Sequence, residues 1–296
     1  MSKYFNDTLR GRAATSAETD PRPRTFEELM DGEAAPAPVV VEPLPEQAQP
    51  APKTFINVSD FLEKSFSGSD SIESARESYR GVRTRLLRLR SSQGLRSVMI
   101  TSASQGEGKS LTSLNLGVCC AQLNDFRILL VDGDLRGKGL TRASGALSRT
   151  GLAEILSGTV EPEKAILHTD LPNLSILASG TATQPSAELF ASRKWQDFIR
   201  WSSETYKLVL VDSPPVLNLA DAELMIAACD GVLMVVHALH TKREALQRAA
   251  SQIDAKKLLG AIYNGVETGA RNSYKHAYGY YEAAPEKDAE PSLTSS

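Results

Sequence analysis

The sequence predicts an α/β fold in which a mostly parallel β-sheet is flanked by helices on both faces. From Ser97 onward, short apolar runs alternate with helical stretches, which is the pattern of successive βαβ units. The apolar runs contain few polar residues, as expected for strands whose two faces are both covered. A glycine-rich loop joins the first of these strands to the helix that follows it.

The expected elements follow one another along the chain. A first helix begins near Asp70, where Asp70 and Glu73 have the spacing of a capping box. One apolar stripe then recurs at steps of three and four residues and consists of Ile72, Ala75, Tyr79, Val82, Leu86 and Leu89. Strands are expected at residues 98–101, 127–131, 207–211, 231–236 and 259–264. Helices are expected after the glycine-rich loop, as far as Leu123, and at residues 151–156, 187–201, 221–228 and 241–253.

Composition changes divide the chain into three parts. Eight of the 15 prolines lie between Pro21 and Pro52, mixed with Ala and Glu, so we expect residues 1–55 to be a disordered tether. Residues 56–268 are expected to form the folded domain. Residues 269–296 are polar and carry several tyrosines, and we expect a mobile tail.

Charge and cysteine content exclude several classes of protein. Lys and Arg total 33 and Asp and Glu total 36, and this net charge of −3 gives no reason to expect nucleic-acid binding. Cys119, Cys120 and Cys229 cannot form a disulfide framework and lack zinc-site spacing, which favours a reducing cytoplasm. No signal peptide is recognisable, and the apolar runs are far shorter than the ~20 residues that span a bilayer. We therefore expect a cytoplasmic protein that needs a partner for any work at a membrane.

The loop from Ala103 to Ser110 has the spacing of a P-loop, with Ala103 where the first glycine is usual. Backbone N–H groups around Gly106 and Gly108 would face phosphate oxygens, and the N-terminus of the next helix adds partial positive charge. Lys109 is expected to neutralise the β- and γ-phosphates of ATP, and the Ser110 hydroxyl to bind Mg²⁺. The alternative is an ordinary glycine-rich turn. The expected nucleotide-binding residues of this P-loop NTPase sheet are Ser104, Gln105, Gly106, Glu107, Gly108, Lys109, Ser110 and Leu111.

Acidic residues follow two of the expected strands. Asp132 and Asp134 come after one strand and Asp212 after another. The carboxyl ends of parallel strands lie on the ligand side of such a sheet, and Mg²⁺ prefers carboxylate oxygens. A single Asp in this place is more often a helix cap or turn residue, but two such ends together with a P-loop favour a magnesium–nucleotide site.

These motifs resemble the BY-kinases, the bacterial tyrosine kinases of capsule and exopolysaccharide loci, over about residues 70–282. The matching segments are residues 103–110 (Walker A), 129–136 (Walker A′), 208–216 (Walker B), 174–180, 185–189 and 260–266. The resemblance implies an ATP- and Mg²⁺-dependent protein-tyrosine kinase that phosphorylates itself and regulates polysaccharide polymerisation and export.

The same resemblance implies roles for single residues. The catalytic set would be Lys109, Asp132, Asp134 and Asp212, with Ser110, Asp132 and Asp212 around the metal. Asp134 would accept the proton of the tyrosine, because a carboxylate near the phenol suffices for this step. Arg136 either adds positive charge near the phosphates or is a solvated surface residue, and Asn264 is a weaker candidate for contact with the adenine.

The resemblance also implies partners. Many BY-kinases carry a membrane-spanning half, and this sequence has none, so a separate transmembrane chain-length regulator would recruit and activate the chain at the inner face of the plasma membrane. A tyrosine phosphatase would be a second partner. Glu77, Arg80 and Arg83 match the Glu-x-x-Arg-x-x-Arg motif by which family members form rings, a head-to-tail contact that must close on itself or extend as a filament. The alternative is an exposed helix face with a local ion pair.

Four of the eight tyrosines lie in the tail, at Tyr274, Tyr278, Tyr280 and Tyr281. By the resemblance they are phosphoacceptors for the active site of a neighbouring copy. Several phosphates would add about −1.5 to −2 charges each and repel one another, which would loosen a ring. The alternative is a tail that only binds a partner.

Two other functions use the same motifs. One is an ATPase switch of the partitioning type, whose members usually carry an additional Lys four residues before the last P-loop glycine. Ser104 occupies that position, which argues against a nucleotide-sandwich dimer. The other is a catalytically weak scaffold of an export complex, which is left open by Gln105, where relatives often have Pro, and by the modest tyrosine cluster.

Overall fold

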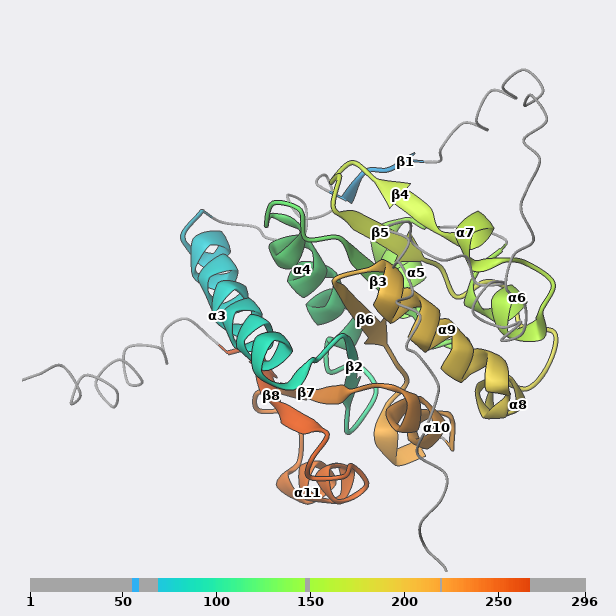
Figure 1. Ribbon diagram of the computed structural model, residues 1–296. Coiled ribbons are helices and arrows are strands. Elements are labelled where there is room, and N and C mark those ends of the chain that lie inside the picture. The colour runs from blue at the N-terminus through green and yellow to red at the C-terminus, as the bar shows by residue number, and fades with distance from the viewer. Residues whose placement is uncertain (1–54, 59–68, 147–149, 219, 267–296) are drawn as a thin grey trace, which may run out of the picture.

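The computed structural model describes residues 55–58, 69–146, 150–218 and 220–266, with side chains described from Ala75 onward in the first helix. These residues form three layers: a central sheet with helices on each side (Figure 1). The tyrosine-bearing tail and the proline-rich segment lie outside the described residues. No described helix combines the length and the apolar character required to cross a membrane.

Eight strands form one sheet in the order β1-β4-β5-β3-β6-β2-β7-β8. All neighbouring strands are parallel except β4 and β5, so the predicted mostly parallel sheet is confirmed. In chain order, the strands are β1 (Phe55–Ile56), β2 (Ser97–Ser102), β3 (Ile128–Asp132), β4 (Leu167–Thr169), β5 (Leu174–Leu177), β6 (Leu208–Asp212), β7 (Gly231–His237) and β8 (Leu258–Asn264). The sequence pattern does not predict β1, β4 and β5, which are short and lie on one side of β3.

Helices cover both faces of the sheet, as predicted. On one face lie α3 (Ser69–Gln93), α4 (Lys109–Ala121) and α5 (Gly139–Ser144). The other face carries α6 (Leu152–Ser157), α8 (Ser186–Ala191), α9 (Arg193–Thr205), α10 (Ala220–Ala228) and α11 (Arg243–Ser251). Two further short helices lie in the described part of the chain, α7 (Pro162–Ala165) and the 3-10 helix η1 (Val216–Asn218).

The strand side chains alternate between two separate cores. Leu208 and Leu210 of β6 face the core beneath α3, α4 and α5, whereas Val209 and Val211 face the core beneath α9 and α10. This alternation is the period-two geometry of a strand, and both sets of side chains are buried. The near-continuous apolar runs in the sequence therefore correspond to strands covered on both faces.

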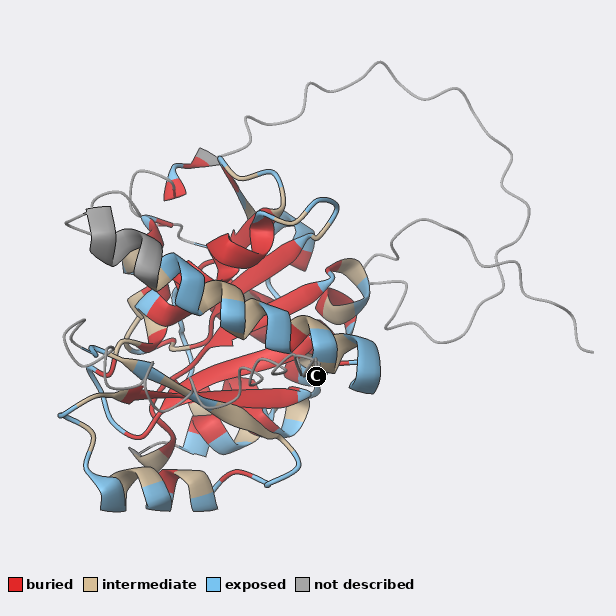
Figure 2. Cartoon of the chain, turned by 90° about the vertical axis from the view of Figure 1, so that its left-hand side faces the viewer, coloured by how far each residue is buried: buried red, intermediate tan, exposed pale blue. Residues whose placement is uncertain are grey.

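The α3 helix covers the sheet with one stripe and leaves its opposite side in solvent, as the burial colours show (Figure 2). Leu86 is buried, and Tyr79, Val82 and Leu89 are partly buried against the same core. These four members of the predicted stripe thus face the protein, and their spacing positions α3 along α4, the helix that carries the P-loop lysine.

The prediction of one helix over residues 187–201 is wrong. The chain breaks at Ser192, which has an extended backbone conformation and separates α8 from α9. Phe190 at the end of α8 packs edge-to-face on Trp195 of α9 with ring centroids 5.1 Å apart. The break lets both helices bury aromatic faces in one core, and the pattern of apolar residues does not reveal this change of direction.

Trp195, Phe198 and Trp201 are fully buried beneath the sheet and are packing residues. We predict that Phe198→Ala lowers the free energy of unfolding by about 3–5 kcal/mol, because it removes a buried ring and leaves a cavity. Urea unfolding followed by circular dichroism measures this change. Gln196→Ala, on the exposed side of the same helix, is the matched control and changes stability by less than ~0.5 kcal/mol. Equal losses in both variants contradict the proposed packing.

Candidate active site

The two acidic strand ends lie side by side at the carboxyl edge of the sheet. Asp132, the last residue of β3, is paired in register with Asp212, the last residue of β6. The backbone of Gly133 donates a hydrogen bond to the carbonyl of Asp212 at 2.8 Å. A Cβ on Gly133 would lie 2.8 Å from that carbonyl, so only glycine allows the two strand ends to approach this closely.

The P-loop follows β2, the neighbour of β6 on the other side. Gly106 and Gly108 have left-handed backbone conformations, with φ of 83° and 89°. A Cβ on Gly106 would meet nothing within 4 Å, whereas one on Gly108 would collide with the amide of Asn264. These two glycines shape the turn before α4, whose first residue, Lys109, is largely buried.

Glu107, a buried residue of the P-loop, holds the loop with its side chain. One carboxylate oxygen accepts a hydrogen bond from the backbone of Ser104 at 3.1 Å, and the other accepts one from the Thr241 hydroxyl at 2.6 Å. The Asn264 amide donates to the Glu107 carbonyl at 3.1 Å. Thr241 and Asn264 follow or end β7 and β8, so Glu107 connects the P-loop to the edge of the sheet.

Ser110, the second residue of α4, donates a hydrogen bond to Asp212 with its hydroxyl 2.6 Å from Oδ2. Ser113, one turn later, contacts the other carboxylate oxygen of Asp212 at 3.3 Å. Gly139 lies so close that a Cβ would collide with the Ser110 hydroxyl. The three predicted elements of the site, from β2, β3 and β6, therefore converge around one hydroxyl and one carboxylate.

Asp132 is fully buried and is held by Thr141. Its Oδ2 accepts hydrogen bonds from the backbone and the hydroxyl of Thr141 at 2.7 and 2.6 Å, and its Oδ1 accepts one from the backbone of Asp134 at 3.2 Å. Both oxygens therefore have protein partners, so Asp132 fits contact with a hydrated cation better than direct ligation.

The burial of two adjacent carboxylates shifts their protonation. Desolvation, opposed by the hydrogen bonds from Thr141, raises the pKa of Asp132 to about 6. Desolvation and the neighbouring charge of Asp132 raise the pKa of Asp212 to about 7. A cation at this edge would favour both charged forms, and a serine hydroxyl beside carboxylates is a donor set that suits Mg²⁺.

No group of three or more His, Cys, Asp or Glu side chains suited to a metal exists among the described residues. This fits Mg²⁺, which keeps several waters and is commonly held by one or two protein groups together with substrate phosphates. Ser110 and Asp212 are the groups at this edge that could donate to such a cation, with Asp132 behind them.

Asp134 lies next to this pair in the turn that leads to α5 and is half-buried. Its Oδ1 accepts a hydrogen bond from the backbone of Gly137 at 2.7 Å. Arg136, at the tip of the same turn, is directed away from the P-loop towards α8 and α10. Its Nε lies 3.0 Å from the Ser186 hydroxyl and 3.6 Å from Asp221. Arg136 is therefore partly exposed and partly held by α8 and α10. Its suggested contribution of positive charge near the phosphates stays a prediction.

The three charged residues of α3 do not share one environment. Arg80 forms an exposed ion pair with Glu77 at 2.9 Å. Arg83 instead donates to the carbonyl of Cys119 in α4 at 2.8 Å, and its Nε is buried. The alternative of an exposed helix face with a local ion pair therefore describes Glu77 and Arg80 but not Arg83, which faces α4.

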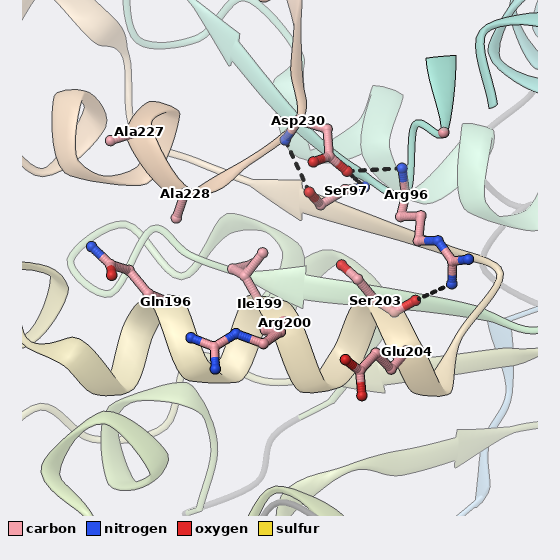
Figure 3. A pocket seen from close by; sticks show the side chains of 11 residues that line it. Arg96, Ser97, Gln196, Ile199, Arg200, Ser203, Glu204, Ala227, Ala228 and Asp230 are labelled. Carbon is pink, nitrogen blue, oxygen red and sulfur yellow. Dashed lines mark hydrogen bonds between the residues drawn. The ribbon is translucent and has the colours of Figure 1, made fainter. Parts of the chain in front are cut away.

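The cysteines are buried, and desolvation raises the pKa of each thiol, to about 12 for Cys120 and Cys229. They are packing residues. A separate hollow of about 740 Å³ lies at the opposite edge of the sheet, beside Arg96, Ser97 and Asp230 (Figure 3). Asp230 accepts hydrogen bonds from the backbones of Arg96 and Ser97 there, far from the converging strand ends.

Sequence reasoning missed several residues of this site. Thr141, Ser113 and Thr241 hold the three carboxylates of the site, and Gly139 allows the approach to Ser110. Thr141 lies nine residues beyond Asp132 and Thr241 lies 134 residues beyond Glu107, so no local spacing indicates these contacts. Ser113 stands one helical turn after Lys109, a spacing that places it on the face of α4 towards the sheet.

Comparison with known proteins agrees with this arrangement. Residues 95–258 match the family described as an AAA domain. The chain is 35% identical over 208 residues to tyrosine-protein kinase YwqD of Bacillus subtilis, which covers 69% of this chain and 85% of the relative. It is 33% identical over 172 residues to tyrosine-protein kinase CpsD of Streptococcus agalactiae, covering 56% of this chain and 74% of the relative.

A solved structure gives the same result. The kinase domain of the Escherichia coli tyrosine kinase ETK has a TM-score of 0.60 and 26% identity, and the match covers 73% of this chain and 81% of that one. The match to YwqD extends over most of that relative. The chain therefore belongs to the bacterial tyrosine-protein kinases, a family built on the P-loop fold.

Proposed function

We propose that the chain is an ATP- and Mg²⁺-dependent protein-tyrosine autokinase. In this proposal it transfers the γ-phosphoryl group to tail tyrosines of a neighbouring copy and thereby regulates exopolysaccharide polymerisation and export. The observation that carries the proposal is the 2.6 Å hydrogen bond between the Ser110 hydroxyl and Asp212, with Asp132 in register beside it. This grouping joins the P-loop helix to both acidic strands in a family of tyrosine kinases.

In this site the backbone of residues 104–111 would hold the phosphates, with Lys109 at the β- and γ-phosphates. Ser110 and Asp212 would ligate Mg²⁺, and Asp132 would orient its waters. The cation would supply charge neutralisation for the leaving phosphate. Phosphoryl transfer depends mostly on position and electrostatics, so buried carboxylates with fixed hydrogen bonds suit the task.

Asp134 is the proposed acceptor of the tyrosine proton. The phenol oxygen would form a bond to the γ-phosphorus while the bond to the β,γ-bridging oxygen breaks, and the phenolic proton would pass to the Asp134 carboxylate. The hydrogen bond from Gly137 fixes Oδ1 and orients the second oxygen. Its half-buried position at the open edge of the sheet allows an incoming side chain to approach.

The regulatory part of the proposal concerns partners. Tyr274, Tyr278, Tyr280 and Tyr281 would enter the site of the next copy in a ring, to which Glu77 and Arg80 contribute exposed charges. A separate transmembrane chain-length regulator would activate the cytoplasmic chain at the inner membrane face, and a tyrosine phosphatase would reverse the modification. Accumulated phosphates on the tails would repel one another, and the ring would dissociate.

We predict that Lys109→Met reduces autophosphorylation at least ~10²-fold, because the phosphates lose their charge partner. Incubation with radiolabelled ATP, Mg²⁺ and the cytoplasmic segment of a chain-length regulator, followed by phosphosite mass spectrometry, measures the modification at each tail tyrosine. Lys138→Met, which alters a lysine held by the Gly180 carbonyl, is the control and keeps its activity. ATP-dependent dimers without phosphotyrosine in the natural chain would contradict the kinase proposal and favour an ATPase switch.

The Asp212 carboxyl gives a pH prediction for the chain without nucleotide and Mg²⁺. Its pKa of about 7 in the folded state exceeds the ordinary value, so the folded chain binds more protons than the unfolded chain between about pH 4 and 7. The free energy of unfolding therefore falls as the pH rises through this window, and Asp132 acts in the same direction.

We accordingly predict that Asp212→Asn raises the Tm by about 2–4 °C at pH 8, where the buried carboxylate is charged, and hardly changes it at pH 5. Thermal scans at both pH values measure the difference. The exposed carboxylate of Glu204 provides the control variant Glu204→Gln, which has no such pH dependence. A Tm at pH 8 that is lower for Asp212→Asn than for the natural chain would show that burial of the charged Asp212 carboxylate does not destabilise the fold.

Arg80 and Arg83 offer a matched pair of variants. We predict that Arg83→Ala lowers the free energy of unfolding by about 0.5–1.5 kcal/mol, because the carbonyl of Cys119 loses its donor. Arg80→Ala changes stability little, since its pair with Glu77 is exposed, but it weakens ring formation. Denaturant unfolding and analytical ultracentrifugation separate the two effects. If Arg80→Ala lowered the free energy of unfolding more than Arg83→Ala, the assignment of Arg83 to the α3–α4 contact would be excluded.

A further inference from the structure

A polar network outside the magnesium site links three elements at the carboxyl edge of the sheet. Ser186, the first residue of α8, donates its hydroxyl proton to Asp221 Oδ2 at 2.6 Å and accepts a hydrogen bond from Arg136 Nε at 3.0 Å. Asp221, in the first turn of α10, lies 3.6 Å from the same guanidinium nitrogen. Ser186 and Asp221 are both buried, whereas the Arg136 side chain is 57% exposed. One end of the arginine is thus fixed by the protein and the other end is open.

The turn that carries Arg136 is itself fixed. The Asp134 carboxylate accepts a hydrogen bond from the backbone of Gly137, and the Asp134 carbonyl accepts one from Lys138 at 2.7 Å. These contacts hold Arg136 at the tip of the turn, two residues beyond the proposed proton acceptor. Because α8 and α10 pack against each other, Ser186 and Asp221 form a rigid support beneath the arginine.

The strand order places Arg136 on the acceptor side of the site. The P-loop follows β2, and the turn with Arg136 follows β3, with β6 between them. Neighbouring strands are about 4.8 Å apart, so the two loops are separated by roughly 10 Å across the edge. A nucleotide held by the P-loop would direct its terminal phosphoryl towards β6 and β3. The acceptor therefore arrives from the side where Arg136 lies.

The terminal nitrogens of Arg136 make no hydrogen bond to any described residue that the structure records, and they face solvent. A guanidinium held by Nε presents its remaining N–H groups in a fixed fork, which suits a carboxylate. The neighbouring carboxylate of Asp221 is already bonded to Ser186 and lies beneath the arginine. The free side of the fork is available for an oxyanion of another molecule.

We propose that Ser186 and Asp221 are positioning residues that fix Arg136 as the receptor for a carboxylate beside the acceptor tyrosine. Glu282, which directly follows Tyr281, is the matching group in this chain's own tail. This inference rests on the proposed function, because it assigns the way in which the acceptor segment of a second copy is recognised. Asp221 acts through Arg136 and does not touch the reacting atoms.

The test measures binding of a fluorescein-labelled peptide of residues 271–296 by fluorescence anisotropy, with Mg²⁺ and ADP present. The full chain carries Glu282→Gln, so that its own tail does not supply a competing carboxylate. We expect Arg136→Ala to raise the peptide Kd about tenfold, and Asp221→Asn and Ser186→Ala to raise it about threefold to tenfold. The double variant Arg136→Ala/Asp221→Asn should match Arg136→Ala alone, whereas the calorimetric Kd for MgADP stays unchanged.

A peptide with Glu282→Gln provides a readout that does not depend on folding. It should bind the natural site about tenfold more weakly than the unchanged peptide does. On the Arg136→Ala site, the two peptides should have the same Kd. Asp197 is another buried carboxylate beside an exposed arginine, Arg200, and Asp197→Asn and Arg200→Ala are controls that leave the peptide Kd unchanged.

Two results overturn the inference. The first is a peptide Kd that is the same for Arg136→Ala and for the natural site. The second is weaker binding of the Glu282→Gln peptide that persists when the site carries Arg136→Ala. The inference is also overturned if the peptide Kd depends on Arg136 only when the peptide is phosphorylated at Tyr281, because the arginine then binds the phosphate. Peptide binding involves no transfer. A chain that binds as expected and never phosphorylates tyrosine therefore contradicts the proposed function alone.

Discussion

The register between β3 and β6 places two carboxylates next to each other where neither is in water. Asp132 and Asp212 are both fully buried. Desolvation raises the pKa of each carboxyl, and the charge of Asp132 raises the pKa of Asp212 further. Such a pair is stable only with donors on every side or a cation between them. Thr141, Ser110 and Ser113 supply the donors, and a bound Mg²⁺ would supply the charge. The rest of the edge is arranged around this requirement.

Close backbone approach is the second requirement. Gly133 and Gly139 allow the β3 turn to lie against Asp212 and Ser110, where a Cβ would collide with the carbonyl or the hydroxyl. Glu107 performs a related task for the P-loop, since its buried carboxylate ties the loop to Thr241. These contacts hold the phosphate-binding backbone in place without side chains that reach the ligand, which is a precondition for electrostatic catalysis.

Three arginines have different environments in this fold. Arg80 is exposed and paired within its own helix, Arg83 joins α3 to α4, and Arg136 is held by α8 and α10 with its fork open. Arg83 thus contacts α4, the helix that begins with Lys109. Charge alone does not distinguish these three roles, whereas the packing of the helices does.

The amino-acid sequence alone predicts the strand–helix alternation, the mostly parallel sheet, and the P-loop with its glycines. These features depend on local periodicity and short spacings, which one-dimensional patterns contain. The roles of the predicted site residues and the tail tyrosines stay predictions. The packing of the folded chain was needed to show that residues 187–201 break at Ser192 and that Arg83 faces α4. It also shows that Thr141, Thr241 and Asp221 support charged groups far along the chain. Such contacts arise when the helices pack on the sheet, and no spacing along the chain encodes them.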